Sequence, residues 1–443
     1  MGPLPVMARF EGESHTLLEN NNHHVKFTRN ASHVQDELRS FRSYLRWMCV
    51  DQTTFPSACI SWAVFAVFGL AVPAASHFLL ACGECDAVHE RPFDSLVQLS
   101  MTGVATLSFL CLSTFVRRYG LRRFLFFDKL WDESETVRRG YTQQLNSSLK
   151  ILLIFIIPSV LTESAYKIWW YASGASQIPF LGNIYASDTV ACILEICSWL
   201  YRTTVIFLVC VLFRLVCSLQ ILRLQDFAQV FHNDSDVASM LSEHLRIRRH
   251  LRIISHRYRA FILWALIMVT ISQFAALLVT TKSGANLNIF KAGELALCSM
   301  TLVAGLGIIF RSATKITHKA QAVTCLAAKW HVCSTLDGSF QGEEGGETPA
   351  AAEAGRGQAF PFVDTDGETD GEDEDDDSTK LVPGYAFTTI SFQKRQALVT
   401  YFENNRTGIT VYGFTLDRST LHTIFGIELS FVLWVLGKTI GIS

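Results

Sequence analysis

Four ionisable side chains lie deep within stretches of the chain that are mostly apolar. Glu163 and Lys167 share one such stretch, and Glu195 and Arg202 share the next. Inserting a charged side chain at bilayer depth costs roughly 2.5–3.5 kcal/mol, so each group must face a partner or water. The chemistry open to these residues is therefore ion pairing between helices or polar recognition of a ligand.

The spacing of these residues indicates which of them meet. The two charges on each segment are four or seven residues apart, which places them on one helix face. At a rise of about 1.5 Å per residue in antiparallel segments, the depth of Glu163 matches that of Arg202, and the depth of Lys167 matches that of Glu195. We predict ionic contacts between the two segments. Two interpretations stay open: the pairs only hold the bundle together, or they form the polar wall of an outward-facing ligand cavity.

A second candidate site is the sequence "CGEC", in which Cys82 and Cys85 follow the first apolar segment. On an oxidising side of a membrane, two such thiols favour a short disulfide or a link to a partner. Two free cysteines at the membrane interface remain an equal alternative. A zinc site would need more ligands than the neighbouring residues offer, so we expect no metal here.

Signatures of enzymatic chemistry are missing from the chain. The sequence contains no phosphate-binding glycine loop, HExxH, GxSxG or kinase motif. We therefore expect a protein that is not an enzyme, has no cofactor and binds no nucleic acid.

The elements that position these residues follow from composition. Of the 443 residues, 49% are hydrophobic and 12% aromatic, which is typical of an integral membrane protein. A membrane-crossing helix needs about 20 apolar residues. Seven segments satisfy this requirement: residues 55–81, 96–116, 151–171, 190–217, 260–281, 294–310 and 420–442. The sequence thus predicts an all-α polytopic membrane protein with seven transmembrane helices.

Lysine and arginine residues near the segment ends predict the direction of the chain. Twenty-one of them fall on one side and three, Arg91, Lys282 and Lys291, on the other. Because cytoplasmic loops carry the excess of Lys and Arg, the N-terminus is predicted to be cytoplasmic and the C-terminus exoplasmic. A G-protein-coupled receptor has the opposite orientation, and we exclude that class. The plasma membrane is the expected location.

The predicted domain organisation follows from charge and hydropathy. Residues 1–54 form a cytoplasmic N-terminal region, and residues 55–337 hold the first six spans with cytoplasmic helical loops. Residues 338–380 are rich in Gly, Glu and Asp, so they cannot bury enough surface to fold and are expected to be a disordered acidic linker. Residues 381–443 supply a cytoplasmic helix and the last span.

The last segment carries a family resemblance. The stretch "TVYGFTLDRSTLHTIFGIELSFVLWVLGKTIGIS" resembles the terminal helix of the plant gustatory-receptor-like proteins, a family labelled as a domain of unknown function. Through that family the chain resembles the insect odorant and gustatory receptors. The plant resemblance spans Arg39 to Ser443 except for the acidic insert. The resemblance to the insect receptors implies a tetrameric ligand-gated cation channel: the last helix lines a central pore, and each subunit has a cytoplasmic helical anchor domain and an outer cavity for an unknown small molecule.

From this resemblance we predict which residues of the last helix form a stripe that lines the pore. Glu428, Val432, Val435 and either Lys438 or Thr439 share one helix face, and Val432 and Val435 could gate by dewetting. The insect terminal motif has Thr-Tyr where this chain has Glu428-Leu429, and Gln where it has Val435. These departures argue against carrying over the cation selectivity of the insect receptors, and a ring of four lysines formed by Lys438 would instead favour anions.

The leading hypothesis is a channel subunit in the lipid bilayer, most simply a homotetramer. The alternative is a non-conducting membrane scaffold or transporter that keeps the same fold. In a monomer, the last helix would instead pack at the centre of the bundle.

Overall fold

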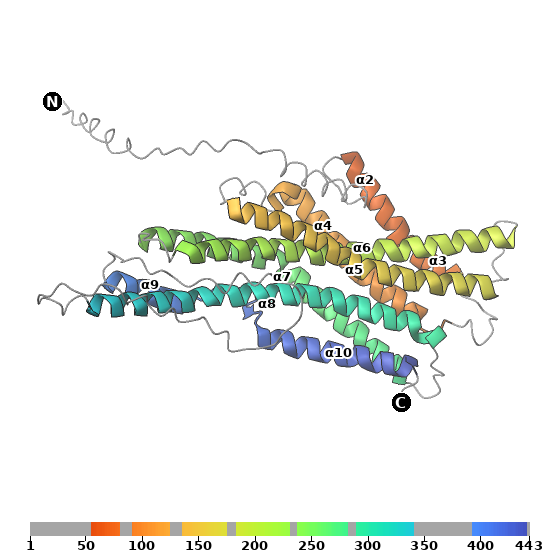
Figure 1. Cartoon of the computed structure of the whole chain (residues 1–443). Helices are drawn as coiled ribbons and strands as arrows, with labels where there is room; N and C mark the ends of the chain where they lie inside the picture. The colour runs from red at the N-terminus through yellow and green to blue at the C-terminus, as the bar shows by residue number, and fades with distance from the viewer. Residues whose placement is uncertain are drawn as a thin grey trace, which may run out of the picture. The chain divides into compact units, whose positions relative to one another are not determined.

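Seven helical segments that are long and apolar enough to cross a membrane make up most of the structure (Figure 1). The computed structural model describes residues 55–79, 91–124, 135–174, 183–230, 237–281, 289–340 and 392–440. These residues belong to one unit, Leu45–Ser443. The predicted all-α fold with seven spans is confirmed. The calls on residues 1–54, on the acidic linker at 338–380 and on Cys82 and Cys85 fall outside the described residues, apart from the last turn of one helix that runs to Phe340.

The first span consists of three consecutive pieces: α2 (Phe55–Val64), a π-helical stretch (Phe65–Ala71) and α3 (Val72–Leu79). The π-helical stretch ends just before Pro73, which has no N–H to donate to the preceding turn. Large apolar side chains on this span remain exposed, among them Phe55 and Phe78. Such a surface is suited to lipid.

The remaining spans are single long helices. They are α4 (Asp94–Phe124), α5 (Glu135–Gly174), α6 (Ile184–Val230), α7 (Val237–Thr281), α8 (Ile289–Phe340) and α10 (Arg418–Ile440). Helices α5 to α8 contain 40 to 52 residues. At about 1.5 Å per residue each is about 60–80 Å long, roughly twice the ~30 Å hydrocarbon core of a bilayer. These helices therefore extend beyond the membrane, as the sequence predicts.

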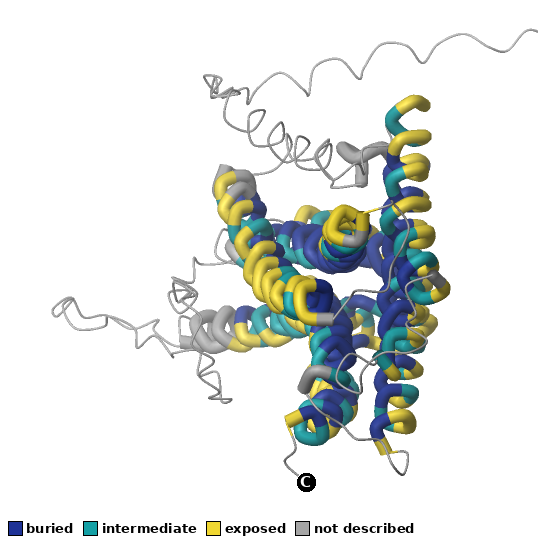
Figure 2. Tube along the Cα trace, turned by 90° about the vertical axis from the view of Figure 1, so that its right-hand side faces the viewer, coloured by how far each residue is buried: buried dark blue, intermediate teal, exposed yellow. Residues whose placement is uncertain are grey.

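Helices α6 and α8 form the centre of the bundle. In each of them 78% of the most apolar stretch is buried, against 17% for α10. Helix α6 packs against α4, α5, α7 and α8. Every residue from 202 to 213 is buried, which is expected for a helix that is apolar on all sides. Figure 2 shows buried residues where helices face one another and exposed residues on their outer sides.

A short helix and a hairpin precede the last span. Helix α9 (Phe392–Asn404) packs against α7 and α8. Strands β1 (Thr410–Val411) and β2 (Phe414–Thr415) pair in antiparallel fashion. Their two-residue turn has positive φ at Tyr412 (49°) and Gly413 (95°), the combination that tight hairpins require. The sequence analysis did not predict this hairpin.

The hairpin segment is attached to the long helices by hydrogen bonds from its backbone N–H groups to side-chain hydroxyls. The N–H of Thr410 donates to Ser255 Oγ on α7 at 3.1 Å, and the N–H of Ile409 donates to Thr317 Oγ1 on α8 at 3.1 Å. Asp417 then caps α10 by accepting hydrogen bonds from the N–H (2.9 Å) and hydroxyl (2.7 Å) of Thr420. The start of the last span is thereby fixed relative to α7 and α8.

Candidate functional site

Three of the four ionisable residues singled out in the sequence, Glu163, Lys167 and Glu195, meet in one buried charge cluster. Lys167 of α5 is at its centre, with its Nζ 3.0 Å from Glu195 Oε2, 3.2 Å from Glu294 Oε1 and 3.5 Å from Glu163 Oε1. The Lys167 side chain is only 2% exposed. The predicted contact between Lys167 and Glu195 is therefore present, and one ammonium serves three carboxylates from α5, α6 and α8.

Glu195 has the most complete set of partners in the cluster. Besides Lys167, its carboxylate lies 3.4 Å from Arg91 Nη1 and accepts a hydrogen bond from Ser76 Oγ of α3 at 2.5 Å. The guanidinium of Arg91 lies 3.7 Å from the ring centroid of Trp170, a cation–π geometry. The cluster thus joins α3, the segment before α4, α5, α6 and α8.

The predicted pair between Glu163 and Arg202 is wrong. Among the described residues, no ion pair joins them; Glu163 instead approaches Lys167, one turn along its own helix. Arg202 Nη1 donates to Gln98 Oε1 (2.8 Å) and Thr102 Oγ1 (3.3 Å) on α4, and its Nε donates to the Ser198 carbonyl at 3.5 Å. Depth matching identified the level of each charge but not the direction in which its side chain points.

Sequence reasoning missed two members of the cluster, Arg91 and Glu294. From the sequence, Arg91 was assigned to an outer loop. In the structure its guanidinium lies in the cluster, beside Glu195. Glu294 is a single carboxylate at the beginning of an apolar segment, and that position was the signal that could have included it. Ion pairing between spans is thus more extensive than predicted.

A small cavity adjoins the cluster between α3, α4, α5 and α6. Pro73 and Trp199 supply apolar walls, and Ser76, Gln98, Glu163, Lys167, Glu195 and Arg202 supply polar ones. Both oxygens of the buried Glu163 carboxylate lack a hydrogen-bond donor among the described residues. The cavity has a volume of about 10 Å³, which is room for about one water molecule.

The last helix requires a correction of the predicted pore stripe. A side chain that lines a pore between subunits must be exposed on an isolated subunit. Glu428, Val432, Val435 and Thr439 are buried, and Lys438 is half-buried with its ammonium 5.7 Å from the ring centroid of Trp434. The stripe proposed from the sequence is therefore the face with which α10 packs against α7 and α8.

The opposite face of α10 is free in the subunit. Thr423, Gly426, Ser430 and Leu433 are exposed there at intervals of three and four residues, and Gly437 continues the line. The hydroxyls of Thr423 and Ser430 donate to carbonyls of their own helix at 3.0 and 2.7 Å. Larger apolar side chains flank this line on both sides: Ile427, Leu429 and Trp434. The alternative that α10 packs at the bundle centre is therefore also wrong.

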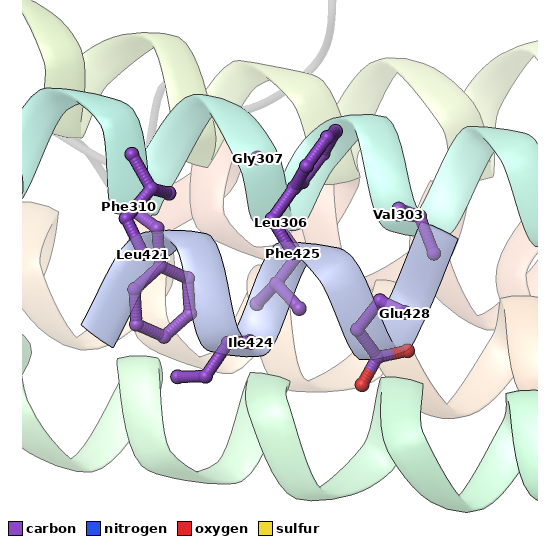
Figure 3. A pocket seen from close by; sticks show the side chains of 8 residues that line it. All are labelled: Val303, Leu306, Gly307, Phe310, Leu421, Ile424, Phe425 and Glu428. Atoms are coloured by element: carbon purple, nitrogen blue, oxygen red, sulfur yellow. The ribbon is translucent and has the colours of Figure 1, made fainter. Parts of the chain in front are cut away.

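An apolar groove lies between α8 and the first half of α10 (Figure 3). A Cβ added at Gly307 would lie 3.4 Å from the Phe425 ring, an ordinary van der Waals distance. In Figure 3 the carboxylate of Glu428 points away from Val303 and α8. It accepts a hydrogen bond of 2.5 Å from Thr270 Oγ1 on α7. This contact links the last helix to α7.

Metal binding finds no support in the part of the chain that the structure describes. No group of three or more His, Cys, Asp or Glu side chains there has a geometry that could hold a metal ion. Eight described cysteines, from Cys59 to Cys325, are free thiols. The cluster around Lys167 is thus a site of ion pairs and hydrogen bonds.

Comparison with known proteins identifies the family of this chain. The model of a family described as "Protein of unknown function (DUF3537)" matches residues 36–427. The chain belongs to this family. No curated protein matches the sequence.

A solved structure shows the fold. The insect olfactory receptor OR5 from Machilis hrabei is similar at 12% sequence identity with a TM-score of 0.51, covering 90% of this chain and 99% of the receptor. The same receptor in complex with eugenol gives 11% identity, a TM-score of 0.48 and the same coverage. This DUF3537 protein thus has the seven-helix fold of an insect olfactory receptor and is an integral membrane protein.

Proposed function

We propose that this protein is a subunit of a ligand-gated ion channel in which α10 lines a central pore of an oligomer, most simply a homotetramer. The fold shared with an insect olfactory receptor supports this proposal. The observation that carries it is the two-sidedness of α10: one face packs on α7 and α8, and the other carries small and hydroxylated residues exposed on the subunit.

The composition of that exposed face fits a pore better than a lipid surface. On α5 the outward side chains are large and apolar, as at Ile154, Leu161 and Ile168. On α10 a narrow line with Gly426 and Ser430 runs between flanks of larger side chains. Small residues let helices approach an axis closely, and the flanks would contact neighbouring subunits. Leu433 is the large apolar residue on the line and would form the constriction.

The orientation is part of the proposal. The excess of Lys and Arg at one side supports a cytoplasmic N-terminus and an exoplasmic C-terminus in the plasma membrane. The extended ends of α6 and α7, at Val230 and Val237, would then form the cytoplasmic anchor with α9. The charge cluster around Lys167 would face the outer half of the membrane, where a small-molecule ligand could enter.

The mass of the purified protein and its conductance in lipid bilayers test the proposal that it is an oligomeric channel. Purified full-length protein in detergent should have the mass of an oligomer and should produce unitary currents in planar bilayers. Leu433→Ala should raise the open probability without ligand, because it widens the constriction. Leu161→Ala, which removes the same side chain from an exposed position on α5, is the matched control. A monomer without currents would favour the alternative of a non-conducting scaffold or transporter.

A further inference from the structure

The tip of the β1–β2 hairpin exposes two aromatic side chains. Tyr412 in the turn is 54% exposed, and Phe414 at the start of β2 is 79% exposed. The other apolar residues of this segment, Ile409, Val411 and Leu416, are buried. The hairpin therefore packs one side on the protein and turns its aromatic tip outward. Large apolar side chains that are exposed together mark a contact surface for another molecule.

Three helices define a membrane boundary near the hairpin. On α7, residues 260–281 contain no Asp, Glu, Lys or Arg, and Arg259 directly precedes this run. On α8, the uncharged run 295–310 ends at Arg311. Helix α10 begins at Arg418 and has 23 residues, so at about 1.5 Å per residue it is only slightly longer than the ~30 Å hydrocarbon core. Each of these arginines therefore marks the level at which a span enters the bilayer.

The contacts of the hairpin segment are made at that level. The guanidinium carbon of Arg259 lies 5.1 Å from the ring centroid of Tyr412. On α8, Thr314 Oγ1, three residues after Arg311, donates to the carbonyl of Asp417 at 3.4 Å. The aromatic tip thus lies in the headgroup region of a bilayer, where aromatic side chains are enriched in membrane proteins.

Cationic side chains accompany the aromatic tip. Arg259 stacks on Tyr412, and its Nη2 lies 3.2 Å from Nε2 of the exposed His256. Arg418 is exposed four residues after Phe414. In the part of the chain that the structure describes, neither guanidinium forms an ion pair with a carboxylate. Both are therefore available for an anionic group from outside the protein.

We propose that the hairpin tip is a lipid-binding site at the membrane interface. Tyr412 and Phe414 lie between the headgroups, and Arg259 and Arg418 bind the phosphate of an anionic phospholipid. Guanidinium groups form strong charge-assisted hydrogen bonds with phosphate. The proposed orientation makes this the cytoplasmic leaflet, which carries anionic lipids. The site itself depends on the depth of the hairpin and not on conduction.

Lipid is favoured over a protein partner because of this depth. At the level of the headgroups, lipid covers every surface that protein does not cover. A lipid bound at the tip would also restrain the start of the last span, since residues 415–417 alone separate Phe414 from Arg418 at the beginning of α10. In the proposed channel, anionic lipid would thereby act on the helix that lines the pore.

Photo-crosslinking of the purified full-length protein in lipid nanodiscs identifies the occupant. Phe414 is replaced by p-benzoylphenylalanine, which keeps an aromatic ring, and the adducts are identified by mass spectrometry. The same replacement at Phe392 is the matched control. That side chain is also exposed, but its ring lies 5.0 Å from the ring of His331, about 30 Å along α8 beyond Arg311. We expect lipid adducts at Phe414 and none at Phe392.

Mixed nanodiscs of phosphatidylserine and phosphatidylcholine test the two arginines. We expect phosphatidylserine to be enriched roughly fivefold or more among the adducts at Phe414, relative to its share of the nanodisc. The double change Arg259→Gln and Arg418→Gln should abolish this enrichment, and Lys at both positions should keep it because the charges remain. The double change Arg252→Gln and Lys394→Gln, at exposed positions farther from the membrane, should leave it unchanged.

The outcomes separate this inference from the channel proposal. Adducts at Phe414 with a second copy of the chain or with the chain itself, without lipid, would overturn the site. Equal labelling of the two lipids, or an enrichment that persists in the folded Gln variant, would also overturn it. If the Gln variant fails to fold, the enrichment in the protein with both arginines decides. Enriched phosphatidylserine adducts in a protein that passes no current would support the site and contradict the channel.

Discussion

At the scale of single residues, the membrane interior of this protein is organised around carboxylates with few donors. Glu428 is 2% exposed and receives one hydrogen bond, from Thr270, while its Oε2 has no donor among the described residues. In the charge cluster one ammonium, that of Lys167, is shared by three carboxylates. Glu428 and Glu163 each depend on one nearby donor group, Thr270 Oγ1 and Lys167 Nζ, so the loss of that group should reduce stability.

Replacing Thr270 by Val should destabilise the contact between α7 and α10. The change keeps the shape of the side chain but leaves the Glu428 carboxylate without its hydrogen bond, at a cost of about 1 kcal/mol. Unfolding in mixed micelles would measure the loss. Thr281→Val on the same helix, where the hydroxyl is exposed and bonds only to its own helix, is the control. Equal stability of the two variants would contradict the role given to Thr270.

Replacing Lys167 by Met should have a larger effect. Three carboxylates would lose their shared cation, and breaking a buried ion pair by removing one partner typically costs about 3–5 kcal/mol. The yield of folded protein after membrane extraction, followed by size-exclusion chromatography, measures this. Lys394→Met alters an exposed position on α9 and should leave the yield unchanged. A normal yield for Lys167→Met would show that the cluster does not depend on this ammonium.

At the scale of elements, the last helix is positioned by its start and by one face. Asp417 caps its first turn, the hairpin before it is hydrogen-bonded to α7 and α8, and its buried stripe packs on the same two helices. Helix α10 is apolar on nearly all sides, so the sequence contains no amphipathic pattern that would tell the packed face from the free one. That is why the stripe from Glu428 to Thr439 was assigned to the wrong side.

Removing the cap of α10 should loosen the start of the last span. The Thr420 hydroxyl and N–H hydrogen-bond the Asp417 carboxylate and thereby lower its pKa below the usual value. The stabilisation by the charged form is therefore present near neutral pH and is lost as the pH falls through this lowered pKa. Asp417→Ala should lower the unfolding midpoint at pH 7.

Asp417→Asn separates the two contributions of this cap. Asparagine keeps an oxygen acceptor for Thr420 but has no titrating group. Its unfolding midpoint at pH 7 should lie nearer to that of the unaltered protein than the midpoint of Asp417→Ala does. The decrease of the unfolding midpoint on acidification should be smaller in Asp417→Asn than in the unaltered protein. An acid dependence identical in all three proteins would exclude Asp417 as its source.

At the scale of the whole molecule, hydropathy and charge were informative because the bilayer imposes simple demands. Length and lack of charge identify spans, so the seven helices were predictable, and the contact between Lys167 and Glu195 followed from matched depth. The partner of Arg202 was not predictable, because a long side chain can reach α4 or α5 depending on the rotation of α6. The hairpin at Thr410–Thr415 was missed since its strands are only two residues long.

The orientation in the membrane is a prediction at this scale. Twenty-one Lys and Arg residues at one side against three at the other predict that the C-terminus lies outside the cell. An epitope attached after Ser443 should therefore bind antibody on intact cells, whereas one attached before Met1 should bind only after permeabilisation. The reverse staining pattern would contradict the orientation, and with it the assignment of the charge cluster to the outer half.

The most direct measurement of the central claim is the water accessibility of the two faces of α10 during conduction. Ser430→Cys and Val435→Cys are each introduced, and a water-soluble methanethiosulfonate reagent is applied to the protein in planar bilayers. Because Ser430 is on the free face and Val435 is fully buried against α7 and α8, the account predicts that the reagent blocks the current of Ser430→Cys and leaves that of Val435→Cys and of the unaltered protein unchanged. Block at Val435→Cys without block at Ser430→Cys, or the absence of any current from the assembled protein, would contradict it.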